Sequence, residues 1–235
     1  MYTPEDSVTL ADVDSIMNIC VKSLENSDQV TTQALAQLMG HMLAATQVER
    51  IVAATEQSQK GRKEQENSDV STPAHIAAEN TKVLLTPRDM LSQLSAQFNK
   101  APNRKLRAGI IMFYVALLAK LGPSFVEANY SLLVGHLMTD IVSNPKNGTT
   151  RYDKLFIRKL VGALLRELIA VRMLTEQGQI AAIQELSSSY LKRWPALMPG
   201  QVAPTSAILT IALEEVAGLL QQLGNAPPPV QVSRT

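Results

Sequence analysis

Two strongly apolar segments in succession, residues 104–121 and 123–145, constrain the fold of this chain more than any other feature. Ile110 to Ala119 is an unbroken apolar run, so a helix formed there has no fully polar face and needs cover on more than one side. Gly122 can adopt the left-handed conformation that ends a helix, and Pro123 suits the first turn of the next helix. The sequence therefore predicts a helical hairpin that cannot bury itself alone, which is typical of stacked helical repeats.

The composition favours a core of packed helices over a core of stacked sheets. Apolar residues make up 46% of the 235 residues but aromatic residues only 4%, so the core must consist mainly of Leu, Ile, Val, Ala and Met. A sheet sandwich would need alternating β-branched and aromatic residues. Lys and Arg number 22 against 21 acids, and a net charge of +1 gives no electrostatic argument for a nucleic-acid partner.

Several features indicate a protein of the cytosol. Cys20 is the single cysteine, so an internal disulfide is excluded and the chain suits a reducing compartment. The first residues, MYTPEDSVTL, are acidic and lack the apolar core of a secretory signal. The longest apolar run is about half of the roughly 20 residues that cross a bilayer, which favours a buried core helix over a membrane anchor.

Apolar residues recur at helical spacing in about eight segments, and no segment reads as a credible strand, so we expect an all-α protein. Residues 8–54 should form a first helical hairpin, and residues 86–224 a set of HEAT-like repeats in antiparallel hairpins. The expected inner side of the second helix consists of Val30, Ala34, Leu38, Met42 and Ala45. The expected inner side of a long helix over 150–174 consists of Phe156, Leu160, Leu164, Leu168 and Val171.

Two segments do not fit the helical pattern. Residues 55–85 form a charged insertion whose first part, Thr55 to Glu79, has almost no large apolar side chain and contains Gly61 and Pro73. Such a segment cannot bury enough surface to offset the loss of chain entropy, so we expect it to be disordered. The Pro-rich tail, residues 225–235, should be disordered as well.

Candidate catalytic, cofactor or metal residues do not converge in the sequence, and we expect a protein that is not an enzyme and holds no cofactor. The three histidines, His41, His75 and His136, are far apart and have no second ligand at metal-binding spacing. Cys20 belongs to an apolar helix stripe and reads as a small buried side chain. Glu214 and Glu215 read as neighbouring acids on a helix surface and not as a catalytic pair.

Basic residues gather on one side of the helix expected over 150–174. These residues, largely opposite its expected apolar side, are Arg151, Lys154, Arg158, Lys159 and Arg166. Two interpretations remain open: an ordinary solvated face, or an electrostatic contact with an acidic partner segment or an anionic membrane. We refer to these five residues as the basic band.

A loose internal repeat indicates HEAT-type hairpins. Asp28 with Val30, and Asn103 with Leu106 and Arg107, both place an Asp or Asn in a turn before an aliphatic residue that opens the second helix. This arrangement resembles the HEAT pattern, in which the turn residue caps the helix and the Arg bridges to the next repeat. The first copy has Thr at the position of the Arg, so such a ladder would be incomplete.

Longer segments resemble one family more specifically. RAGIIMFYVALLAKLGPSFVEANYSLLVGHLMTDIVSNP is similar to part of the N-terminal region of the HEAT-repeat-containing protein five family, whose fungal members are called large clathrin-adaptor accessory proteins. ENSDQVTTQALAQLMGHMLAATQ upstream, and FIRKLVGALLRELIAVRMLTEQGQIAAIQEL and LEEVAGLLQQLGNA downstream, resemble the same family in the same order. The resemblance covers most of residues 13–226.

The resemblance implies a non-enzymatic accessory scaffold of clathrin adaptor complex one and its accessory proteins. Such a protein would lie in the cytoplasm, peripheral to the trans-Golgi network and endosomes through its partners, and would support retrograde endosome-to-Golgi transport and protein localisation. The alternative is a generic armadillo- or HEAT-type module in nuclear transport or a signalling complex. Family members are long solenoids, so we expect this chain to be a fragment, a split gene product or a truncated relative, with an uncovered apolar patch and self-association at the helix over 205–223.

Overall fold

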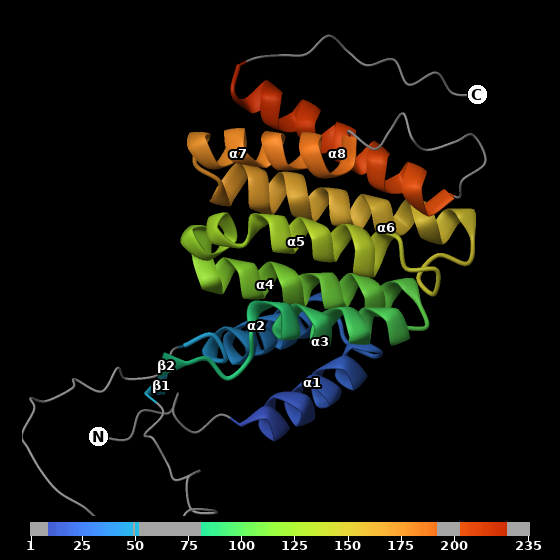
Figure 1. Ribbon diagram of the computed structural model, residues 1–235. Coiled ribbons are helices and arrows are strands. Elements are labelled where there is room, and N and C mark those ends of the chain that lie inside the picture. The colour runs from blue at the N-terminus through green and yellow to red at the C-terminus, as the bar shows by residue number, and fades with distance from the viewer. Residues whose placement is uncertain (1–8, 49, 52–80, 192–202, 225–235) are drawn as a thin grey trace, which may run out of the picture.

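The structure, a computed structural model, describes residues 9–48, 50–51, 81–191 and 203–224, and within these ranges the fold is all-α, as predicted (Figure 1). The eight α-helices are α1 (Leu10–Leu24), α2 (Gln29–Ala45), α3 (Pro87–Lys100), α4 (Arg104–Ala128), α5 (Tyr130–His136), α6 (Arg151–Ala163), α7 (Glu176–Leu186) and α8 (Ala203–Gln222). Short π-helical segments continue three of them: η2 (Leu137–Val142), η3 (Leu164–Met173) and η4 (Ser187–Leu191). The helices follow one another in layers from α1 to α8.

Side-chain caps explain where most of these helices begin. Thr9, Thr86 and Thr150 each accept a hydrogen bond from the backbone N–H three residues on, in the Thr-x-x-Asp pattern. Asp28 and Asn103 cap α2 and α4 in the same way. These contacts satisfy backbone N–H groups that have no partner inside the helix. The turn residues Asp28 and Asn103, which the HEAT pattern singled out, therefore act as N-caps.

The predicted hinge is present inside α4. Gly122 has φ +81° and ψ 177°, a conformation outside the helical region, and Pro123 starts the helical turn that follows. The helix expected over 123–145 is itself broken, because Asn129 has φ −115° and ψ 18° and α5 starts at Tyr130. The sequence pattern did not reveal this second break.

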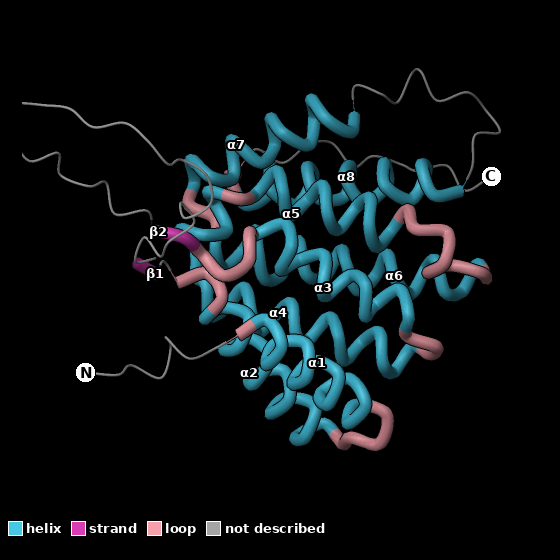
Figure 2. The backbone as a smooth tube through the Cα atoms, turned by 60° about the horizontal axis from the view of Figure 1, so that its bottom comes forward, coloured by secondary structure: helices cyan, strands magenta, loops and turns pink. Residues whose placement is uncertain are grey.

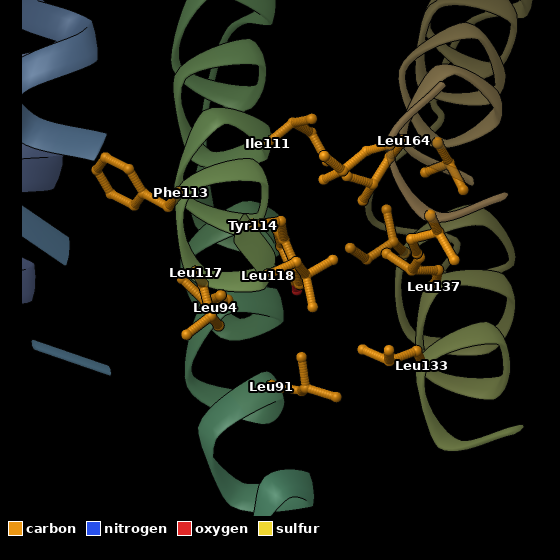
Figure 3. Packing of buried hydrophobic residues seen from close by; sticks show 14 of the residues in the cluster. Leu91, Leu94, Ile111, Phe113, Tyr114, Leu117, Leu118, Leu133, Leu137 and Leu164 are labelled. Atoms are coloured by element: carbon orange, nitrogen blue, oxygen red, sulfur yellow. The ribbon is translucent and has the colours of Figure 1, made fainter. Parts of the chain in front are cut away.

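α4 forms the centre of the core. By length and composition it is the one described helix that could cross a membrane, but it contacts α1, α2, α3, α5, α6 and η3. Phe113 points toward the N-terminal helices, whereas Ile111 and Leu118 point toward Leu137 and Leu164 on the other side (Figure 3). The apolar run thus packs on two sides, as expected for a helix with no polar face.

α2 and α4 approach each other closely at Gly40 (Figure 2). A Cβ atom at Gly40 would lie 2.8 Å from the carbonyl carbon of Ala116 and 2.9 Å from its Cβ, too near for a side chain. Close packing against α4 is therefore the physical reason for a glycine in the middle of this helix. A Cβ at Gly109 would similarly meet the side chain of Leu24 at 2.8 Å.

The predicted inner side of α2 is wrong. Val30 and Leu38 are 73% and 47% exposed, and the buried residues are Ala36, Met39, Gly40 and Leu43. α2 has no charged residue, so both of its faces are apolar or neutral and the periodicity could not tell them apart. The fit of Gly40 against α4 selected the face that contains this glycine.

The predicted inner side of the helix over 150–174 is partly wrong. Leu164 and Leu168 are buried, but Phe156 and Leu160 are only half-buried and Val171 is 58% exposed. Ile157, Val161, Leu165 and Ile169 are buried instead. The helix changes to π geometry at Leu164, and wider turns shift the apolar face relative to an ideal helix.

One end of the predicted insertion is ordered. β1 (Arg50–Ile51) pairs with β2 (Thr81–Lys82) in an antiparallel two-residue ladder, contrary to the expectation of no strand. The backbone N–H groups of Leu84 and Leu85 both donate to the carbonyl of Thr46 at the end of α2. Disorder over 55–85 is therefore wrong for residues 81–85. Residues 52–80 and the predicted tail over 225–235 lie outside the described ranges.

The apolar patch expected on the helix over 205–223 is not present as predicted. Ile211 and Leu219 are fully buried, and Val216 and Leu220 are half-buried. At the opposite end of the stack, α1 and α2 have exposed large apolar side chains, which include Ile19, Val30 and Leu38.

Gly40→Ala tests the close approach of α2 and α4. Alanine in a helix interior gains about 1 kcal/mol over glycine, but the clash with the backbone of Ala116 should cost about 1–3 kcal/mol more than this gain. We expect a lower free energy of unfolding in urea denaturation.

Gly135→Ala is the matched control, because a Cβ there would meet only the Tyr190 hydroxyl, at an ordinary 3.8 Å. It should stabilise the protein or leave it unchanged. Equal effects of the two substitutions would contradict the packing role of Gly40.

Candidate functional site

The structure divides the predicted basic band into two groups. Arg151 and Lys159 are exposed and Lys154 is partly exposed on α6. Arg158 and Arg166 are turned toward α8, where their terminal nitrogens lie 3.8 Å and 3.6 Å from the carboxylate of Glu214. The five residues therefore do not share one open face, because α8 lies beside Arg158 and Arg166.

The exposed part of the band belongs to a larger basic surface. The turn between α3 and α4 and the loop before α6 bring further cations beside the start of α6, at the right-hand edge of Figure 1. We call this surface the basic edge; it consists of Lys100, Arg104, Lys105, Lys146, Arg151 and Lys154. Sequence reasoning missed the first four residues; Lys100, Arg104 and Lys105 come from the α3–α4 turn, which is distant from α6 in the sequence.

Hydrogen bonds and one ion pair hold the basic edge together. Arg104 Nε lies 3.0 Å from Asp153 Oδ1 and joins the start of α4 to the start of α6. Lys105 Nζ donates to the Glu25 carbonyl at 3.0 Å and so links α4 to the end of α1. The guanidinium of Arg104 also lies 5.8 Å from the ring centroid of Phe156. Arg104 and Lys105 are therefore fixed relative to α1, α4 and α6.

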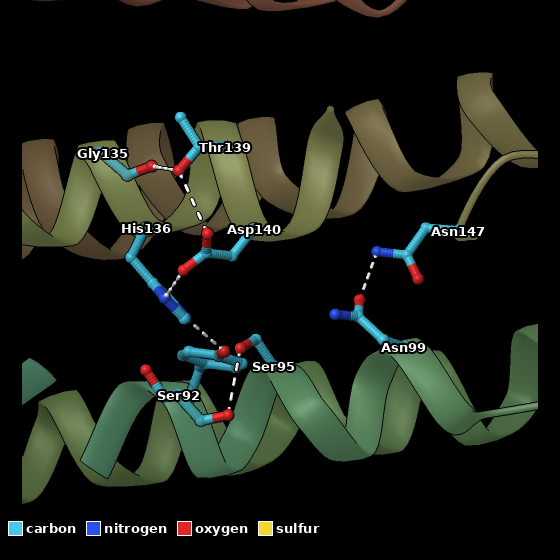
Figure 4. A network of polar contacts seen from close by, with 9 residues as sticks. Ser92, Ser95, Asn99, Gly135, His136, Thr139, Asp140 and Asn147 are labelled. Carbon is cyan, nitrogen blue, oxygen red and sulfur yellow. Dashed lines mark hydrogen bonds and ion pairs between the residues drawn. The ribbon is translucent and has the colours of Figure 1, made fainter. Parts of the chain in front are cut away.

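Asn147 anchors the loop that carries Lys146. The Asn147 side chain is buried and donates to Asn99 Oδ1 at 2.6 Å and to the Ile141 carbonyl at 2.9 Å (Figure 4). Its backbone carbonyl accepts a 2.6 Å hydrogen bond from Arg107. These hydrogen bonds tie the loop to α3, η2 and α4, and they fix its position at the basic edge.

Most carboxylates at the basic edge are already engaged. Asp153 accepts from Thr150 and pairs with Arg104, and these contacts hold its pKa below the usual range. Asp28 accepts from the Thr31 N–H, and this bond lowers its pKa. The lowered pKa values keep both acids ionised, but the basic edge has six cations and so retains an excess of positive charge.

Acids prevail at the other ends of the helices. Asp12 and Asp89 form capping contacts at the starts of α1 and α3. Glu127, near the end of α4, accepts from the Thr175 N–H and hydroxyl at 2.8 Å and 2.6 Å, which lowers its pKa. A chain with a net charge of only +1 therefore has its charges separated along the helix direction.

A polar cleft of about 550 Å³ lies between α3 and the α5–η2 segment. Its lining includes Arg88, Ser92, His136, Thr139 and Asp140. π-Helical turns are frequent at functional positions, and η2 starts immediately after His136. This cleft is therefore a second candidate site.

A hydrogen-bonded chain of three side chains runs from this cleft into the core. The Tyr114 hydroxyl and His136 Nε2 are 2.7 Å apart, and His136 Nδ1 lies 2.9 Å from Asp140 Oδ2. Tyr114 is fully buried and its pKa is raised by burial, so the inner end of the chain is closed to any reacting molecule. The arrangement satisfies buried polar groups of the core.

The remaining candidate residues occupy unremarkable positions. Cys20 is buried in the core, as its place on an apolar stripe predicted, and burial raises its pKa. His41 is exposed on α2, and His75 lies outside the described residues. Within the described part of the chain, no three His, Cys, Asp or Glu side chains are placed to hold a metal ion. The basic edge is the best-defined candidate site.

The chain matches no protein-family model, and it matches no solved structure.

The buried imidazole of His136 should make stability depend on pH. Desolvation lowers the pKa of His136 from 6.5, although Asp140 partly opposes this shift. The folded protein then binds fewer protons here than the unfolded chain, so the stabilising contribution is complete above about pH 6.5 and is lost as pH falls below it.

His136→Gln removes this titration. We expect the free energy of unfolding of the wild type to exceed that of the variant at pH 7.5, and the difference to narrow as pH falls to 5.5. His41→Gln, at an exposed position of α2, should have little effect at pH 7.5. A difference between wild type and His136→Gln that does not vary with pH would contradict the assignment.

Proposed function

We propose that this chain is a non-enzymatic helical scaffold that binds an acidic segment of a partner protein at the basic edge. The observation that carries the proposal is the grouping at one edge of cations from the α3–α4 turn, the loop before α6 and the start of α6, where the Arg104–Asp153 and Lys105–Glu25 contacts hold two of them. A pre-positioned group of charges loses little side-chain entropy when a partner binds. It also steers an oppositely charged partner and fixes its orientation.

A protein partner fits this surface better than a membrane or a nucleic acid. Glu25, Asp28 and Asp153 lie among the cations, so the edge presents a pattern of both signs. A uniform array of phosphates would meet repulsion at these carboxylates, whereas a peptide can place its own acids and bases to match them. Contact with membranes would then be peripheral and depend on partners.

The family resemblance supports a cellular setting for this scaffold. It suggests a HEAT-type solenoid that acts with clathrin adaptor complex one in the cytoplasm, next to the trans-Golgi network and endosomes, in retrograde endosome-to-Golgi traffic. The layered order of α1 to α8 is compatible with such a stack.

The double substitution Lys100→Glu, Arg151→Glu tests the basic edge. Both side chains are exposed, so folding should be unaffected. We expect the affinity for purified clathrin adaptor complex one, measured by fluorescence anisotropy, to fall by about tenfold or more, because each reversed charge at an interface costs on the order of 1 kcal/mol. The affinity of the wild type should also decrease as salt rises from 50 to 300 mM.

Lys120→Glu, Arg172→Glu is the matched control. It makes the same change of charge at exposed positions near the other ends of α4 and η3. The control should bind like the wild type. Equal losses in the two double variants would show that net charge and not the basic edge governs binding, and an absence of binding by the wild type would refute the adaptor as partner.

A further inference from the structure

Two adjacent glutamates on α8 lie in opposite environments. Glu214 has a side chain that is 51% exposed, whereas Glu215 is completely buried. The sequence suggested that both lie on a helix surface, and for Glu215 this is wrong. Together they determine how α8 is held on α6 and η3, which it contacts along with α7, η2 and η4.

Glu214 forms ion pairs with two residues of the basic band. Its carboxylate oxygens lie 3.8 Å from Arg158 and 3.6 Å from Arg166, beyond hydrogen-bond distance. Ion pairs of this length between partly exposed side chains are weak. Arg158 Nε is moreover buried without a hydrogen-bond partner. α8 therefore covers both arginines without satisfying their donors well.

The packing of α8 on its neighbours depends on the protonation of Glu215. Both of its carboxylate oxygens are buried and have no hydrogen-bond partner, and the same is true of the nearby Tyr130 hydroxyl. A buried carboxylate without partners is costly, so the protein favours the protonated form. Desolvation raises the pKa of Glu215 to about 7, against a smaller opposing effect of Arg166.

The charged and titratable groups around α8 do not compensate this carboxylate. From η3, Arg166 is the cation that acts on Glu215, but Glu214 pairs with it. Tyr130 of α5 is influenced by Glu215, by Glu185 of α7 and by Tyr190 of η4. Two further charged groups on packed elements have other partners: Arg158 of α6 pairs with Glu214, and Asp140 of η2 bonds His136.

We propose that α8 is a proton-controlled cover over Arg158 and Arg166, which it occupies through Glu214 until an acidic partner segment displaces it. This inference rests on the proposed function, since the partner recognised at the basic edge would extend along α6 onto the two arginines. Protonation of Glu215 keeps α8 in place, and ionisation draws Glu215 toward water and loosens the whole helix. Arg158 and Arg166 would then be exposed and would extend the basic edge.

The direction of the pH effect follows from proton linkage. While α8 is packed on its neighbours, the pKa of Glu215 is about 7, whereas in a released α8 this pKa should be near the ordinary 4.5. The closed state therefore holds more protons between these values, and rising pH favours release. Between pH 6 and pH 8 the opening constant of α8 should increase about tenfold, and it should level off above that range.

Hydrogen exchange of the full-length chain measures this opening directly. Exchange rates of α8 amides, divided by their intrinsic rates, should show the tenfold rise in the wild type and no rise in Glu215→Gln, which has nearly the same shape but cannot ionise. Glu214→Gln is the control on the same turn. It should open faster at both pH values, because the pairs with Arg158 and Arg166 are lost, yet keep the dependence on pH.

A fluorescent deca-glutamate peptide provides the second measurement. The wild type should bind it more tightly at pH 8 than at pH 6 at constant ionic strength, and Glu215→Gln should bind with equal affinity at both. A tenfold rise of α8 exchange that persists in Glu215→Gln and in a second variant, Glu215→Leu, would overturn the proton-controlled cover. The expected exchange behaviour without any peptide binding would support proton control of α8 but refute both the docking role and the basic edge as an acidic-segment site.

Discussion

The close approach of α2 and α4 at Gly40 is the contact on which the rest of the structure depends. Because no side chain separates the two backbones there, α4 can lie deep enough to contact helices on both of its sides. Its apolar run, which has no polar face, is covered by α2 on one side and by Leu137 and Leu164 on the other. A larger residue at this crossing would displace the central helix and every layer built on it.

The position of α4 also creates the candidate site. Arg104 and Lys105 lie in its first turn, so the depth and direction of this helix decide whether they reach Asp153 on α6 and the Glu25 carbonyl at the end of α1. The buried Asn147 fixes the neighbouring loop by bonding both Asn99 and the Ile141 carbonyl. The charges at the surface are therefore arranged by contacts in the interior.

The two ends of the stack differ in how they are held. α4 is fixed by apolar contacts, which depend little on pH or salt, and its buried Tyr114 hydroxyl is hydrogen-bonded to His136. Under α8, by contrast, Glu215 and Tyr130 have buried oxygens without partners. Low-stability elements are those from which binding and regulatory movements are drawn. The last layer is thus the natural place for a movable cover.

The sequence by itself determined the helical class, the hinge at Gly122, the N-caps at Asp28 and Asn103, and the buried place of Cys20, because these depend on local backbone preference and on strong periodicity. It also located Arg151, Lys154 and Lys159. Only the tertiary structure decided which face of the uncharged α2 is buried, that turns distant in sequence add Lys100 and Lys105 to the basic edge, and that Glu215 is buried while Glu214 covers Arg158. Those outcomes depend on which helices pack together, and periodicity within one helix carries no information about its neighbours.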